Sequence, residues 1–138
     1  MESEEKYKAL FANAREPIFI ADAESGIILD CNASACELVE RTKEELVGKH
    51  QSVLHPPDEM NGEATVTFRR HIANDLGHTL TARVITNTGK VKDVEINADL
   101  LNIMGKKVLQ GFFSDVTERK RAEEALRDSE KRTSFFIF

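Results

Sequence analysis

The segment 115–126 constrains the fold of this chain most, because a strand passes there directly into a helix. Residues 108–113 before it are apolar and aromatic, as in a buried strand. The residues after it are mostly charged, and Thr117 is of a type that caps helix N-termini by accepting a hydrogen bond from a free backbone N–H. The junction predicts a final strand that continues without a loop into an exit helix over residues 118–132.

This exit helix carries a thin heptad pattern. Ala122, Leu126, Ser129 and Thr133 recur at the alternating spacings of a coiled-coil seam, but most of them are small or polar. Such a seam is too weak to hold two helices together alone. We therefore expect a helix that can shift against its partner when the sheet moves, with an output that lies beyond the C-terminus.

The composition is typical of one soluble globular domain. The chain has 138 residues, 41% of them hydrophobic and 31% charged, with a formal net charge of −5. No cluster of Lys and Arg is evident, which disfavours nucleic-acid binding. No apolar run approaches the roughly 20 residues that span a bilayer, and the acidic residues 1–6 do not form a signal peptide. A cytoplasmic location without membrane contact by this segment is expected.

The hydrophobic pattern predicts two strands, a helical block and three further strands between two terminal helices. This order favours an α+β domain in which a five-stranded antiparallel sheet carries the helical block on one face. The expected elements are an amphipathic helix at 3–13, strands at 17–22 and 27–31, short helices after Asn32 and Thr42, a helical turn at 50–54, a longer helix at 62–75 (apolar Ala64, Phe68, Ile72 and Leu76), and strands at 80–86, 91–100 and 108–116.

Four segments in this order resemble the PAS domains of bacterial signalling proteins. Residues 18–21 and 28–35 are similar to the family's first two strands and the Asn that starts its first short helix. Residues 44–49 are similar to its Glu-Glu-Leu-x-Gly-Lys segment, and residues 115–119 to its Asp-x-Thr exit motif. The resemblance covers residues 5–132 and implies the PAS fold, with an N-terminal amphipathic helix and a C-terminal signalling helix of coiled-coil type.

The resemblance also implies how the chain is divided. Residues 3–11 are similar to residues 129–136, as they would be if a second unit of a tandem array began near the C-terminus. The expected divisions are a flanking helix at 1–14, the PAS core at 15–117, the signalling helix at 118–132, and the start of a following module or a disordered tail at 133–138.

PAS domains of this kind are sensory inputs, for example of sensor histidine kinases in two-component signalling. The resemblance implies that this domain detects a small molecule or a partner and signals through its exit helix to an effector outside the chain. No enzyme activity is expected, because the chain has no phosphate loop, nucleophile elbow or zinc-hydrolase motif. None of its 4 His residues has the acidic neighbour that is typical of a kinase phosphoacceptor.

The predicted relay residues are Asp115, Thr117 and Arg119. Asp115 is expected either to bond the hydroxyl of Thr117 or to pair with Arg119. We also expect a parallel homodimer formed by the terminal helices and the outer face of the sheet. The alternative function is that of a ligand-free dimerisation or interaction module.

The space between the helical block and the sheet is expected to be a filled apolar core, with a small ligand cavity as the alternative. Arg83, Asn97 and Gln110 are candidate polar contacts for a carboxylate or another metabolite, although their faces are not assigned. The apolar residues expected to line the space are Phe68, Ile72, Val94, Ile96, Leu109 and Phe113.

No cofactor is the favoured expectation. Flavin photosensors of the PAS family carry an Asn-Cys-Arg-Phe-Leu-Gln run and a Gln two residues before the exit Asp, whereas this chain lacks the run and has Phe113 at that point. Non-covalent flavin is a minor alternative. Haem is disfavoured because His71 lies at least one turn after the position of the axial His in haem-binding PAS domains.

No metal site is predicted either. His50, His55, Asp58 and Glu59 match no common ligand spacing and are expected in a surface loop. The two cysteines, Cys31 and Cys36, are expected to be reduced and partly buried, with a redox role for the pair as the alternative.

Overall fold

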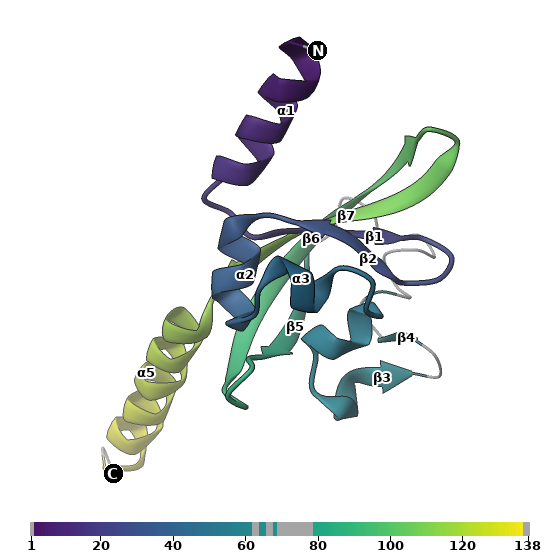
Figure 1. Ribbon diagram of the computed structural model, residues 1–138. Helices are drawn as coiled ribbons and strands as arrows, with labels where there is room; N and C mark the ends of the chain where they lie inside the picture. Colours follow the sequence, from purple (N-terminus) through teal and green to yellow (C-terminus); the bar gives the residue numbers. More distant parts are fainter. Residues whose placement is uncertain (1, 62–63, 66–67, 69–78, 137–138) are drawn as a thin grey trace.

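The computed structural model describes residues 2–61, 64–65, 68 and 79–136. A sheet and a block of short helices form the core, and two terminal helices, α1 (Glu2–Asn13) and α5 (Thr117–Phe136), extend away from it in different directions (Figure 1). Helix α5 continues to Phe136, past the boundary expected at residue 132. None of the helices in the described ranges is long and apolar enough to cross a membrane.

The sequence predicts a five-stranded antiparallel sheet, and within the described residues five strands form one, in the order β2-β1-β7-β6-β5. The two halves of the chain meet where β1 pairs with β7, with Ile18 opposite Phe112 and Asp22 opposite Val108. The final strand therefore lies in the centre of the sheet, between the first strand and β6. The strands are β1 (Ile18–Asp22), β2 (Ile28–Cys31), β5 (Leu80–Ile85), β6 (Val91–Ile103) and β7 (Lys106–Asp115).

The short helices begin where the sequence places capping residues. Asn32 precedes α2 (Ala33–Val39), and its side chain accepts the N–H of Ala35. Thr42 precedes α3 (Lys43–Leu46), where it forms a capping box with Glu45. Two short 3₁₀ helices follow, η1 (Gln51–Leu54) and η2 (Pro57–Glu59).

The prediction of a helix from residue 62 is wrong at its start. Strand β4 (Ala64–Thr65) pairs with β3 (Met60–Asn61) in a short antiparallel ladder. The apolar spacing of four residues fits a helix, but β-branched Thr65 favours extended backbone, and so short a segment does not distinguish the two. Phe68 is helical, and the rest of the predicted helix, with His71 and Ile72, lies outside the described residues.

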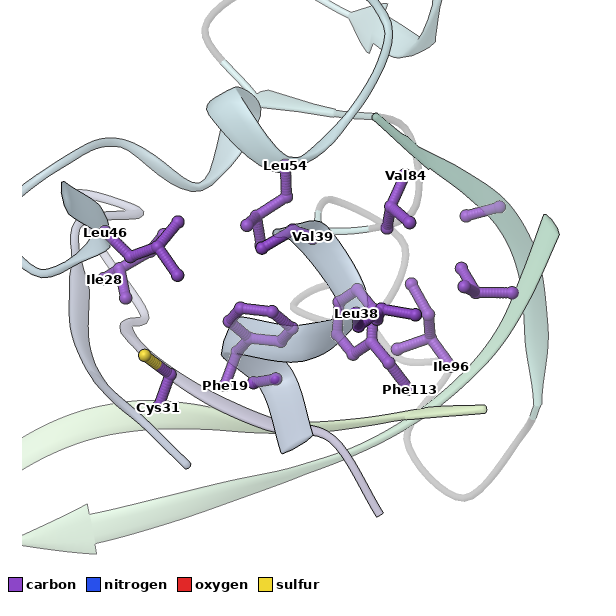
Figure 2. Packing of buried hydrophobic residues seen from close by; sticks show 13 residues of the cluster. Phe19, Ile28, Cys31, Leu38, Val39, Leu46, Leu54, Val84, Ile96 and Phe113 are labelled. Carbon is purple, nitrogen blue, oxygen red and sulfur yellow. The ribbon is translucent and has the colours of Figure 1, made fainter. Parts of the chain in front are cut away.

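The hydrophobic core lies between the helical block and one face of the sheet. Figure 2 shows Phe19 and Phe113 from the sheet converging with Leu38 from α2. The two rings meet edge to face with centroids 4.8 Å apart, a favoured arrangement for aromatic pairs. Along β6 the buried residues Val94, Ile96 and Ala98 alternate with more exposed ones, which fixes the inner and outer faces of this strand.

Candidate functional site

A cavity of about 40 Å³ lies inside this core. Alternate residues of β7 (Leu109, Gly111 and Phe113) form one wall, and η1 with the following loop contributes Gln51 and His55. Since one water molecule needs roughly 10–15 Å³ of such space, the cavity has room for a few water-sized groups. The site is small, enclosed largely by apolar side chains, and polar mainly on its η1 side.

Four of the residues expected to line a ligand site lie beside this cavity. Phe68, Ile96, Leu109 and Phe113 all line the cavity. Val94 is fully buried in the same core cluster but lies outside the set of described residues that surrounds the cavity.

The predicted polar contacts do not reach the cavity. Asn97 is exposed on the outer face, where its Oδ1 accepts the hydroxyl of Thr79 at 2.7 Å. The guanidinium of Arg83 is bound instead by Asp58, at 2.7 Å, and by Glu59, at 3.3 Å. Gln110 lies between two lining residues of β7 and therefore faces the opposite side of the sheet.

Two polar residues at this site, Gln51 and His55, were not predicted from the sequence, and His55 is the more informative of them. Its side chain is buried, not in a surface loop, and its ring stacks on Phe113 with centroids 6.2 Å apart. Nδ1 donates to the backbone carbonyl of Arg83 at 2.6 Å, which ties the loop after η1 to strand β5. This contact joins residues far apart in the sequence, and no local pattern signals it.

Glu59 and Arg83 extend this connection as an ion-pair network. Burial alone would raise the pKa of Glu59, but the nearby imidazole of His55, whose Nδ1 lies 3.4 Å from Glu59 Oε2, and the backbone N–H and charge of Arg83 outweigh it and hold the pKa below its usual value. The Asp58 carboxylate raises the pKa of Arg83. Among the described residues no group of three or more His, Cys, Asp or Glu side chains is arranged to hold a metal ion.

The second candidate element is the junction between β7 and α5. The hydroxyl of Thr117 donates to Asp115 Oδ1 at 2.6 Å, and the N–H of Thr117 donates to the same oxygen at 3.0 Å. Of the two expectations for Asp115, the bond to the hydroxyl is therefore confirmed, whereas Arg119 pairs elsewhere.

Thr117 is not the helix cap that the sequence suggests. It is the first residue of α5, and the carbonyl of Val116 already accepts the N–H of Lys120 at 2.9 Å, which puts Val116 at the cap position. The carboxylate of Asp115 supplies the capping acceptor. Since the hydroxyl of Thr117 is not needed as the cap, it is able to accept the N–H of Asp93 in β6, at 2.9 Å, while it donates to Asp115.

Two ion pairs strengthen this attachment to β6. Arg119 Nη2 lies 2.8 Å from Glu95 Oε2, and Lys120 Nζ lies 3.6 Å from Asp93 Oδ1. Arg119 also approaches Glu123 in the next turn, at 3.6 Å. Partly exposed pairs of this kind add little stability individually, but together they fix where the first turn of α5 lies on β6.

Comparisons with known proteins relate this chain to a single family. A family model described as PAS fold matches residues 5–116. The methyl sulfide methyltransferase-associated sensor of Methanosarcina acetivorans is 25% identical to this chain over 127 residues. That match covers 91% of this chain and 12% of the sensor, so the chain spans only a small part of this relative.

Solved structures show the same similarity. A domain of the sensory box sensor histidine kinase/response regulator of Geobacter sulfurreducens is 30% identical, with a TM-score of 0.62 over 80% of this chain and 92% of that domain. The PAS domain of a protein from Colwellia psychrerythraea is 19% identical, with a TM-score of 0.72 over 84% of this chain and 98% of that one.

Proposed function

The chain belongs to the PAS family of sensory domains, and we propose that it detects a small molecule in its core cavity and relays this event through α5 to a histidine-kinase-type effector outside the chain. The observation that carries the proposal is the continuity of β7. Leu109, Gly111 and Phe113 line the cavity, and the same strand ends at Asp115, where α5 is capped. A ligand that displaces this wall moves the start of α5.

Strand β6 supplies a second connection. Ile96 and Ala98 face the cavity, while Asp93 and Glu95 on the same strand contact the first turn of α5. Helix α5 is thus held by both β6 and β7, the two strands whose residues line the cavity. A change in their relative position would alter the direction in which α5 leaves the sheet.

The cavity indicates the chemistry of the proposed ligand. Its walls are apolar except near Gln51 and His55. A small, largely apolar molecule with one hydrogen-bonding group directed at η1 would fit these walls. Neither a flavin nor a haem is part of the proposal, because the sequence lacks the run of the flavin photosensors and places His71 at least one turn after the axial position of haem-binding PAS domains.

The relay is proposed to act in a parallel homodimer. Leu10 in α1 is 65% exposed and Leu126 in α5 is 61% exposed, so each terminal helix presents an apolar side chain that a second copy would cover. The alternative function, a ligand-free dimerisation module, uses the same helices and leaves the cavity empty.

Native mass spectrometry separates these two functions. The purified chain, as isolated and after incubation with a small-molecule library, is compared with its denatured mass. A sensory domain should carry an added mass that is lost on denaturation, and a ligand-free module should show the dimer without it. Absence of any bound molecule under both conditions would contradict the sensory proposal.

Gly111 provides a variant specific to the cavity. A Cβ at this position would lie 3.0 Å from Phe113 Cε1, so Gly111→Ala adds a methyl group to the wall. This variant should retain less of the added mass than the wild type. Gln110→Ala, on the opposite face of the same strand, is the matched control and should retain it fully.

The relay is tested in the longer protein that contains the effector. Asp115→Ala or Thr117→Ala should uncouple effector output from the stimulus while the domain still binds its ligand. Unchanged regulation in both variants would contradict the role of this junction.

A further inference from the structure

The two cysteines lie opposite each other at the joint between β2 and α2. Cys31 is the last residue of β2, and Cys36 lies in α2. Their Sγ atoms are 3.8 Å apart, and both thiols are free. A disulfide needs a sulfur separation of about 2 Å, so a modest rotation of the two side chains and a small shift of α2 would bring them into bonding distance.

The two thiols differ in their access to solvent. Cys31 is 3% exposed and belongs to the core cluster, where Figure 2 shows it below Ile28 and Leu46. Cys36 is only partly buried and packs against the edge of that cluster. A reagent from solvent therefore reaches Cys36 more readily than Cys31.

We propose that Cys31 and Cys36 are a site of reversible oxidation, at which a hydroperoxide converts the pair into an intramolecular disulfide. With hydrogen peroxide, the hydroperoxide used in the test below, the Cys36 thiolate attacks one peroxide oxygen, the O–O bond breaks, and Cys36 becomes a sulfenic acid as hydroxide leaves and is protonated to water. The Cys31 sulfur then attacks the Cys36 sulfur, the S–O bond breaks, and the second oxygen leaves as water. The peroxide is reduced to two waters, and the two thiols are oxidised by two electrons.

Electrostatics support this order of events. Burial, the neighbouring Cys36 and Asp30 raise the pKa of Cys31 to about 12, so Cys31 is a poor first nucleophile. Lys43, which lies 2.7 Å from Asp30, opposes this by favouring the thiolate. Once Cys36 is a neutral sulfenic acid, it no longer repels a negative charge on Cys31.

The position of the pair gives the disulfide a structural consequence. Asn32, next to Cys31, accepts the N–H groups of Ile18 and Ala35 and donates to the carbonyl of Glu16 at 2.9 Å. These bonds fasten the connection between α1 and β1 to the start of α2. Formation of the disulfide would draw α2 toward the end of β2 and displace Asn32. The connection to α1, which Asn32 holds, would then shift with the oxidation state of the pair.

Thiol counting tests the site directly, and it requires neither the proposed ligand nor the effector. The purified chain is treated with hydrogen peroxide, denatured, alkylated with N-ethylmaleimide and weighed. After peroxide treatment the wild type should take up no N-ethylmaleimide and should weigh two hydrogens less than the reduced chain. Dithiothreitol should restore both alkylation sites. Two alkylated thiols after peroxide treatment, or disulfides only between chains, would overturn the proposal.

Single variants test the order of the steps. In Cys31→Ala the sulfenic acid of Cys36 has no internal partner and should be trapped by dimedone, whereas in Cys36→Ala the buried thiol should remain alkylatable after unfolding. The opposite pattern would overturn the assignment of Cys36 as the first thiol to react.

Hydrogen exchange then measures the structural consequence in the wild type. The amides of Ile18 and Ala35 should change their exchange rates on oxidation and return on reduction. An oxidised protein with unchanged exchange at both amides would overturn the transmission to α1.

Discussion

Thr117 Oγ1 lies 2.6 Å from Asp115 Oδ1 and also accepts the N–H of Asp93, so one hydroxyl joins β7, β6 and the first residue of α5. Because both partners of this hydroxyl belong to the sheet, the helix cannot turn about its first residue without breaking one of the two bonds. The junction therefore fixes the angle at which α5 leaves the sheet.

Replacing Thr117 by Val should weaken this junction while keeping the side-chain volume nearly constant. The N–H of Asp93 loses its acceptor, and an unsatisfied buried group costs about 1–3 kcal/mol. We expect a loss of this size in the free energy of unfolding, measured by urea denaturation, and faster exchange of the Lys120 amide. Thr117→Ser keeps the hydroxyl and should lose much less. Equal losses in the two variants would show that the methyl group contributes as much as the hydroxyl, which would contradict a junction held mainly by this hydrogen bond.

Replacing His55 by Phe should destabilise the helical block. The ring volume is roughly retained, but the buried carbonyl of Arg83 loses its donor, and we expect a cost of about 1–3 kcal/mol in urea unfolding. Arg83→Met is the matched control, since it removes only the partly exposed ion pairs to Asp58 and Glu59 and retains that carbonyl. A larger loss in the control would contradict the importance of the His55 bond.

Local features of this fold are readable from the sequence. Asn32 and Thr42 cap their helices as predicted, because a cap depends on residues within one turn. The alternation of Val94, Ile96 and Ala98 likewise excludes Asn97 from the inner face. The expectation that Asn97 contacts a ligand is therefore wrong for a reason that the sequence pattern already contains.

Long-range features are not readable in this way. The burial of His55 depends on a hydrogen bond to β5, and the placement of Thr117 depends on Asp93 of β6. Neither partner is close in sequence, so type and spacing alone assign His55 to a loop and Thr117 to a cap. The cavity itself depends on which strand faces meet, which only the assembled sheet determines.

Asp22 should make the stability of the domain depend on acid pH. The N–H of Ser25, the side chain of Lys106 and the N–H of Glu24 all bind its carboxylate, and its pKa falls from 3.8 to about 2. A lowered folded-state pKa means that the stabilisation is complete above 3.8 and is lost as the pH falls toward 2. Urea unfolding across this window should show a decline that is smaller in Asp22→Asn.

Lys106→Met serves as the control for this effect. It removes the ion pair at 2.9 Å but leaves the bond from Ser25, which is the larger cause of the lowered pKa. Most of the decline should persist in this variant. A decline that vanishes in Lys106→Met would assign the effect to the ion pair instead.

Leu126 should contribute to self-association more than to folding. Its side chain is 61% exposed in the single chain, so truncation removes little intramolecular packing, whereas in a parallel pair of α5 helices it would lie in the seam with Ala122. Sedimentation velocity over a range of concentrations should show that Leu126→Ala shifts the equilibrium toward monomer without changing the unfolding midpoint of the monomer. Glu124→Ala, on the other side of the helix, should leave the equilibrium close to that of the wild type. Equal effects of the two substitutions would mean that α5 does not associate through this seam, and the proposed relay would then have to act within a single chain.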